Sequence, residues 1–170
     1  FNGNKIITTG GGGILLINSK YIAKRAKHLT QIAKKSNTLF SDHDEVGYNY
    51  RLPNINAALG LAQMEMLEKF IEKKRKLSKL YYERCKHYEF NMYREIKYSK
   101  ANCWLNILIA KNKKERDFLL KFTNKKNVVT RPSWIPMHRL EMNKKFQCND
   151  LKNTNWLFDR IICLPSSVIK

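Results

Sequence analysis

Residues 4–13 read N-K-I-I-T-T-G-G-G-G, and residues 14–18 continue as I-L-L-I-N. A lysine, Lys5, stands before a short β-branched run, and four of the chain's seven glycines then follow side by side. β-Branched residues favour strands, whereas glycine adopts positive φ and allows another backbone to approach closely. The pattern therefore predicts two strands, residues 6–9 and 13–18, joined by a tight glycine turn.

The glycine run does not match a known phosphate-binding loop. A P-loop has its lysine after the glycines, and a dinucleotide fingerprint has a helix after them, but here Lys5 comes first and a strand-like segment follows. Two interpretations of Lys5 remain open at this level. It is either a surface lysine that keeps its amine in water or an amine of lowered pKa that attacks a carbonyl group.

The rest of the chain alternates between helical and extended patterns. Apolar residues at helical spacing predict a helix over residues 20–34 capped by Ser19, and a long helix over 54–87 capped by Asn54. Gly60, inside the long helix, indicates close packing against another backbone. Further elements are expected as a strand over 101–110, a helix over 113–124, an extended segment over 127–134, a helix over 150–160 and a strand over 161–164. This alternation is typical of a small α/β domain.

Composition excludes some classes of protein and leaves others open. The formal charge of +19 is compatible with a nucleic-acid partner, but the lysines are dispersed among glutamates, so a solvated surface without nucleic acid explains the charge better. No apolar run approaches the roughly 18 residues of a membrane span. Four cysteines without a C-x-x-C pair indicate the reduced thiols of a cytoplasmic protein. The chain begins with Phe1, and we expect it to be a piece of a longer protein.

The neighbouring residues His43, Asp44 and Glu45 could suggest a metal site. Residues adjacent in sequence seldom share one ion, so we predict no metal here.

Two motifs carry a resemblance to a known family. The run F-N-G-N-K-I-I-T-T-G-G-G-G-I-L-L-I-N and the later run H-D-E-V-G-Y-N-Y-R-L-P-N-I-N-A-A-L-G-L-A-Q resemble the DegT/StrS family of pyridoxal phosphate-dependent nucleotide-sugar aminotransferases. The stretches R-P-S-W-I-P-M-H-R-L and W-L-F-D-R-I-I-C-L-P-S-S are similar to that family as well. The resemblance is strongest to the branch that aminates UDP-linked 4-keto-6-deoxy-N-acetylhexosamines, on pathways to bacillosamine- or legionaminic-acid-type sugars.

The resemblance implies the C-terminal half of a fold-type-I aminotransferase, an α/β fold. Residues 1–53 would then belong to the end of the large cofactor-binding domain, residues 54–87 would form a long connecting helix, and residues 88–170 would form a truncated small α/β domain.

The resemblance also implies roles for single residues. Lys5 matches the lysine that attaches pyridoxal 5'-phosphate covalently. We infer from the small size of glycine that the glycines after it would leave room beside the cofactor. Asn49 and Arg51 match residues that approach the cofactor phosphate of the neighbouring subunit in a homodimer. Three more residues are expected near the substrate: His43, Arg131 and His138.

The implied activity is transfer of an amino group from glutamate to a nucleotide-linked 4-keto-6-deoxy sugar, with a UDP-sugar expected. The family's residues that pair with the pyridine nitrogen and stack on the ring lie upstream of this chain, so these 170 residues alone are expected to be inactive. Three other hypotheses stay open: a basic nucleic-acid-binding module, a silent protein that keeps the fold, and another reaction on the same cofactor. The sugar, and amination at C3 or C4, are not decided.

Overall fold

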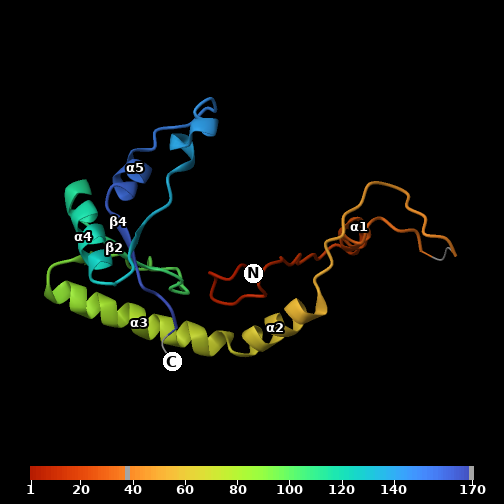
Figure 1. Ribbon diagram of the computed structural model, residues 1–170, viewed down its shortest axis with the longest axis horizontal. Coiled ribbons are helices and arrows are strands. Elements are labelled where there is room, and N and C mark those ends of the chain that lie inside the picture. The colour runs from red at the N-terminus through yellow and green to blue at the C-terminus, as the bar shows by residue number, and fades with distance from the viewer. Residues whose placement is uncertain (37–38, 169–170) are drawn as a thin grey trace. The chain divides into compact units, whose positions relative to one another are not determined.

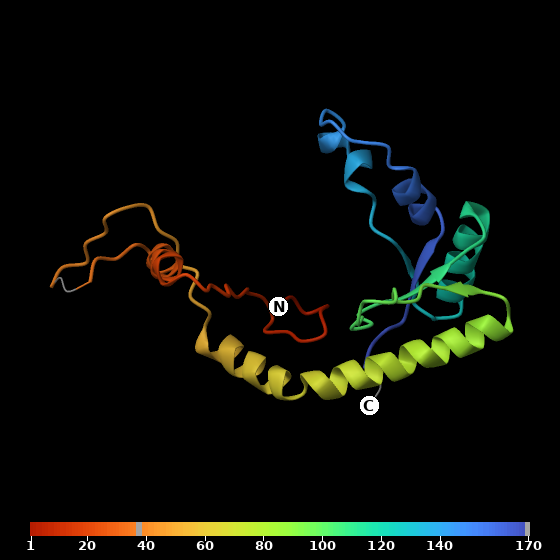
Figure 2. The same cartoon turned by 180° about the vertical axis from the view of Figure 1, so that it is seen from behind.

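The structure is a computed structural model that describes residues 1–36 and 39–168. The chain forms two compact units, Phe1–Leu67 and Glu68–Lys170. Each unit is described by itself, and Figures 1 and 2 show their elements from opposite sides.

The first helix of unit 1 is α1, Lys20–Thr30. The Ser19 hydroxyl accepts a hydrogen bond from the Ile22 N–H at 3.4 Å, which confirms the predicted cap. The helix ends at Thr30 and not at residue 34, because Ile32 and Ala33 have φ of 61° and 47°. These left-handed conformations cannot continue a right-handed helix.

The predicted glycine turn is present, but the two strands around it are not. Gly10 and Gly12 have φ of 79° and 95°, the conformation for which glycine is suited. The segments 6–9 and 13–18, however, form no strand ladder among the described residues. The Thr9 N–H donates to the Phe1 carbonyl at 3.1 Å, so the segment curls back on itself and offers no straight edge. A strand needs a neighbouring strand for its hydrogen bonds, and within the described residues none pairs with the apolar run from Ile14 to Leu16. This run is exposed, with exposed fractions of 66% for Ile14 and 88% for Leu16.

The long helix predicted over residues 54–87 is divided into α2, Asn54–Glu65, and α3, Leu67–His87. Met66 interrupts it with φ −98° and ψ −4°, and its N–H bonds back to Gln63, a tightened closing turn typical of a helix end. Pro53, not Asn54, is the N-cap, because its ψ of 145° lies outside the helix while its carbonyl accepts the Ala57 N–H at 3.0 Å.

Unit 2 contains a four-stranded antiparallel sheet with the order β1-β2-β4-β3. Its two central strands, β2 and β4, are labelled in Figure 1. The strands are β1 Asn91–Met92, β2 Asn106–Ile109, β3 Arg131–Pro132 and β4 Ile161–Leu164. The last matches the predicted strand, whereas β2 is shorter than the predicted 101–110. Cys103 has φ 51°, which breaks the extended conformation before β2. Only two residues of the extended segment 127–134 join the sheet, at the edge position where proline is tolerated.

Among its described residues, unit 2 contains two more α-helices besides α3. They are α4, Lys113–Lys125, capped by the Asn112 side chain, and α5, Lys152–Phe158. Two single turns of 3₁₀ helix, Met137–Arg139 and Glu141–Asn143, lie between β3 and α5. The core consists of Leu108, Ala110 and Ile162, and residues of α4 pack against it. The α/β class expected from the alternation is confirmed.

Two further properties complete the description. None of the helices within the described residues is long and apolar enough to cross a membrane. The four cysteines are free thiols, and burial raises the pKa of Cys85 and of Cys163.

Candidate functional site

Lys5 lies in a hydrogen-bonded turn at the start of unit 1. Its backbone N–H donates to the Asn2 carbonyl at 3.0 Å, and its side chain is exposed. The Thr8 hydroxyl closes the other end of the turn, since it donates to the Phe1 carbonyl at 3.0 Å and accepts the Gly10 N–H at 2.9 Å. The segment that carries the Lys5 amine is therefore fixed by backbone geometry although it is not a strand.

Thr9 attaches this turn to α2. Thr9 is 3% exposed, and its backbone carbonyl accepts a hydrogen bond from the Asn56 side-chain amide. A Cβ at Gly60 would lie 2.8 Å from the Thr9 methyl group, so the missing side chain of Gly60 makes this approach possible. Close packing at Gly60 is confirmed, but the neighbour is a side chain and not the backbone that the sequence indicated.

The segment Gly47–Arg51 is bound along the end of α1. Tyr48 N–H donates to the Leu29 carbonyl at 2.7 Å, Ile32 N–H to the Tyr48 carbonyl at 3.1 Å, and Tyr50 N–H to the Thr30 carbonyl at 3.0 Å. At Gly47 a Cβ would lie 2.4 Å from backbone atoms of Ile32 and Ala33. The glycine of the G-Y-N-Y-R motif is thus required by contact between two backbones.

This anchoring presents the polar side chains of the motif. Tyr48 and Tyr50 stack with ring centroids 5.2 Å apart, while Asn49 between them forms a β-bridge to Gln31. Asn49 and Arg51 are both exposed. An amide and a guanidinium held on a fixed segment are suitable donors for the oxygens of a phosphate group.

The loop between α1 and the motif is held by ion pairs. Arg25 binds Glu45 through two N–H groups, and His28 Nε2 lies 2.6 Å from Asp44 Oδ1. These partners lower the pKa of both carboxyl groups. His28, Asp44 and Glu45 lie close enough to share a cation, but the Arg25 guanidinium already occupies the Glu45 carboxylate. The arrangement is explained by ion pairing.

His43 is part of the same loop and has a structural contact. Its Nδ1 lies 2.7 Å from the Ile32 carbonyl, which makes it a donor to the backbone after α1. The other ring nitrogen, Nε2, then remains for another partner.

Arg131 and His138 belong to unit 2. Arg131 is exposed on β3 and pairs with Cys163 of β4. His138 is half-buried, lies 3.1 Å from the Asn155 amide oxygen, and lines a pocket of about 400 Å³. The predicted candidates therefore fall into three local groups: Lys5 in the N-terminal turn, His43, Asn49 and Arg51 in the loop after α1, and Arg131 with His138 in unit 2.

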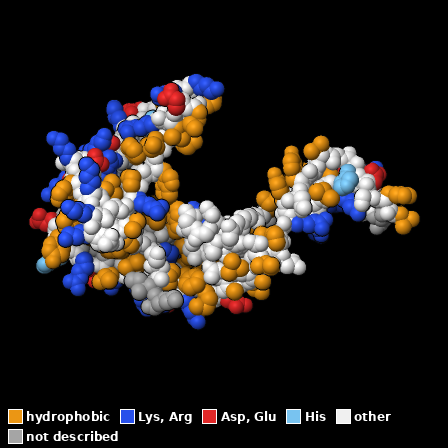
Figure 3. All heavy atoms as spheres, viewed as in Figure 1, with side chains coloured by type: hydrophobic (Ala, Val, Ile, Leu, Met, Phe, Trp, Pro, Cys, Tyr) orange, Lys and Arg blue, Asp and Glu red, His pale blue; other side chains and the backbone are white. Residues whose placement is uncertain are grey.

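Charge is distributed without a continuous basic groove on the face that Figure 3 shows. Lys and Arg side chains are scattered over unit 2 and stand among apolar and acidic ones. Several lysines are paired at helical spacing, as Lys76 is with Glu72 at 2.7 Å.

Sequence reasoning missed a larger pocket in unit 2. It has a volume of about 1000 Å³ and lies between α3 and the residues around β1 and β2. Two basic residues of α3 bind the backbone of its wall. Lys74 Nζ donates to the Trp104 carbonyl at 3.2 Å, and Arg75 donates two hydrogen bonds to the Ala101 carbonyl. The helical spacing does not distinguish one lysine of α3 from another. It therefore did not predict that Lys74 is buried, with 5% of the residue exposed.

Comparison with known proteins gives a family and a fold. The model of the DegT/DnrJ/EryC1/StrS aminotransferase family matches residues 1–168. The chain is 34% identical over 171 residues to EpsN of Bacillus subtilis strain 168, whose name describes a pyridoxal phosphate-dependent aminotransferase; the match covers 98% of this chain and 44% of EpsN. It is 33% identical over 168 residues to GDP-perosamine synthase of Escherichia coli O157:H7, covering 98% of this chain and 45% of that enzyme.

Solved structures agree on the fold. The sugar aminotransferase CalS13 from Micromonospora echinospora superimposes with a TM-score of 0.81 at 16% identity, covering 97% of this chain and 45% of that one. This chain spans less than half the length of the curated relatives that it matches.

Proposed function

Because the chain belongs to the DegT/DnrJ/EryC1/StrS aminotransferase family, we propose that the complete protein transfers an amino group from glutamate to a nucleotide-linked 4-keto-6-deoxy sugar. The family uses pyridoxal 5'-phosphate. One observation carries the proposal: the family match includes a lysine, Lys5, on a turn fixed by hydrogen bonds and followed by glycines with positive φ.

The residues present fit this cofactor by their chemistry. Its aldehyde requires a primary amine, and Lys5 presents one on the exposed side of its turn. Its phosphate requires N–H donors, which Asn49 and Arg51 supply from a segment fixed to α1. When bound, the cofactor supplies an electron sink for the carbon that loses or gains a proton.

Lys5 has two roles in this proposal. Its amine attaches the cofactor, and once released by the amino donor it moves a proton to and from the reacting carbon. General acid–base catalysis of this kind typically contributes about 10²- to 10⁴-fold. Thr8 and Thr9 hold the backbone so that the amine returns to the same place after each half-reaction.

Asn49 and Arg51 act in a second subunit under this proposal. They lie in the loop after α1, whereas Lys5 lies in the N-terminal turn, and we propose a homodimer in which this loop completes the phosphate site of the partner's lysine. The rigid Gly47 contact supports such a role, because a loop that crosses to another subunit must keep its conformation.

For the sugar substrate we propose contacts from His43, Arg131 and His138, and UDP as the nucleotide. The pocket of about 400 Å³ beside His138 supports a substrate contact there. One relative described above is named for a GDP-sugar, so nucleotide preference is a separate test from amino transfer. We further propose that residues 1–53, 54–87 and 88–170 are the end of the large domain, the connector and the small domain, and that the enzyme is cytoplasmic.

The test uses the complete protein with Lys5→Ala and, as a matched control, Lys20→Ala, which removes an exposed lysine at the start of α1. Formation of 2-oxoglutarate from glutamate in the presence of the keto-sugar nucleotide is measured. We expect Lys5→Ala to lose at least about 10³-fold in turnover and Lys20→Ala to lose none. Full turnover in Lys5→Ala would refute the proposal, and salt-sensitive nucleic-acid binding without turnover in the unaltered protein would favour the basic-module alternative.

A further inference from the structure

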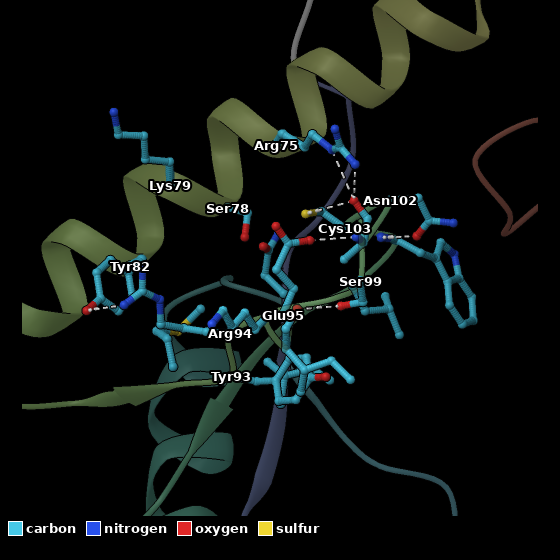
Figure 4. A pocket seen from close by; sticks show the side chains of 18 of the residues that line it. Arg75, Ser78, Lys79, Tyr82, Tyr93, Arg94, Glu95, Ser99, Asn102 and Cys103 are labelled. Atoms are coloured by element: carbon cyan, nitrogen blue, oxygen red, sulfur yellow. Dashed lines mark hydrogen bonds between the residues drawn. The ribbon is translucent and has the colours of Figure 1, made fainter.

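The larger pocket of unit 2 combines aromatic surfaces with guanidinium groups. Its volume of about 1000 Å³ is at the upper end of what small-ligand sites usually have. Figure 4 shows side chains of α3 facing those of the segment after β1 across it. No residue of this pocket is among the candidates that the motifs supplied.

One wall of the pocket is an aromatic platform. Trp104 and Trp134 are stacked with ring centroids 6.0 Å apart and planes 17° from parallel. Trp134 is 69% exposed, which leaves a large part of its ring surface uncovered. An exposed indole next to a second, parallel indole is a surface on which a planar ring binds by stacking.

Two arginines that line the pocket, Arg94 after β1 and Arg75 of α3, carry positive charge at fixed positions. The Arg94 guanidinium lies 4.2 Å from the centre of the Tyr82 ring and donates to the Tyr82 hydroxyl at 3.2 Å. Arg75 donates two hydrogen bonds to the Ala101 carbonyl, at 3.0 and 2.7 Å. Both arginines are thereby held in place, and each guanidinium has further N–H groups to offer an anion.

The pocket also contains an acidic side chain, Glu95. Glu95 accepts the Ala101 N–H at 2.6 Å, so its carboxylate is directed at the backbone of the wall (Figure 4). The same wall contains Cys103 with φ 51°, a left-handed conformation that a cysteine rarely adopts. Two basic side chains of α3 therefore hold a strained wall in one position beside the indole platform.

We propose that this pocket binds a nucleoside diphosphate, its base stacked on Trp134 and its phosphates bound by Arg94 and Arg75. The chemistry decides the class: the platform selects a planar ring, and the guanidinium groups select an anion that accepts paired hydrogen bonds. This ligand is either the nucleotide half of the substrate, an identity that rests on the proposed function, or a free nucleotide bound at a separate site.

Binding is measured by calorimetry on the complete protein with UDP, GDP and dTDP as probes. Trp134→Leu should weaken binding by about tenfold or more, and its control Trp156→Phe, an indole outside the pocket, should not. Arg94→Gln should weaken it by about tenfold, and Arg84→Gln, an exposed arginine of α3 outside the pocket, should not. Uridine and inorganic pyrophosphate alone should each bind more weakly than UDP.

Further measurements distinguish a nucleotide that is part of the substrate from a separate effector. They also test the nucleotide pocket independently of the proposed role of Lys5. If the ligand is part of the substrate, the variants raise the KM for the sugar nucleotide and added UDP competes with it; if it is a separate effector, neither occurs although UDP binding is lost. Trp134→Leu should retain the reducible cofactor on Lys5, and Lys5→Ala should still bind UDP, so the two proposals fail independently. Absence of binding by all three nucleotides at about 1 mM, or equal loss in the variants and their controls, would overturn the inference.

Discussion

Replacing Gly47 by alanine should destabilise the loop that carries Asn49 and Arg51. The new Cβ would lie 2.4 Å from backbone atoms of Ile32 and Ala33, and neither peptide can rotate away as a side chain could. The segment would have to lift from α1, breaking the three backbone hydrogen bonds of Tyr48, Ile32 and Tyr50. At about 1 kcal/mol for each bond, the local loss is about 3 kcal/mol.

The measurement is hydrogen exchange at the amides of Tyr48 and Tyr50 in the complete protein. A loss of about 3 kcal/mol speeds exchange through local opening by roughly two orders of magnitude. Gly11→Ala is the matched control, since a Cβ there meets nothing within 4 Å and Gly11 has no positive φ. If Gly47→Ala exchanges at the same rate as Gly11→Ala, the backbone contact does not hold this loop.

Three further changes test other contacts. Gly60→Ala should lower the free energy of unfolding by about 1–2 kcal/mol, because the new methyl group meets the Thr9 methyl group. Thr9→Ser, which removes that methyl group, should restore most of this stability in the double variant. If the double variant is as unstable in urea as Gly60→Ala alone, the contact is not the cause. Burial lowers the pKa of Lys74 below its ordinary value of 10.5, so between these two pKa values the unfolded state binds more protons than the folded state. The free energy of unfolding therefore rises with pH in this range. Lys74→Met should flatten this rise in urea titrations at several pH values, and an unaltered slope would contradict the assignment. The hydrogen bond from His28 lowers the pKa of Asp44, so the stability that this pair contributes is present above the ordinary carboxyl pKa and is lost as pH falls below about 4. Asp44→Asn should remove this part of the acid sensitivity in thermal unfolding. An acid profile identical to that of the unaltered protein would disprove the pairing.

Much of the fold was predictable because local patterns decide it. The Ser19 cap and the helix over α4 depend on neighbours in sequence, and both were found in place. The strand at 161–164 was also found, and there β2 and β3 are available to pair with it. The strands around the glycine run were predicted wrongly, because β-branched residues indicate a strand only where another strand is available to pair with it. The break at Met66 gave no signal, since helical spacing continues through it.

Of the candidate site, the sequence predicted local conformations that lie within a short motif. Gly10 and Gly12 have the positive φ that the glycine run predicted, whereas the backbone contact at Gly47 was not predicted from its motif. The pocket of unit 2 could not be found in this way. It depends on Trp104 and Trp134, thirty residues apart in sequence, and on buried contacts of α3 that resemble ordinary solvated lysines and arginines in the sequence.

The most direct test of the account is to reduce the complete protein with borohydride and to locate the modified residue by peptide mass spectrometry. We expect a phosphopyridoxyl group on the amine of Lys5 and loss of this group in Lys5→Arg. A reduced adduct on any other lysine, or none in a protein that still transfers amino groups, would contradict it.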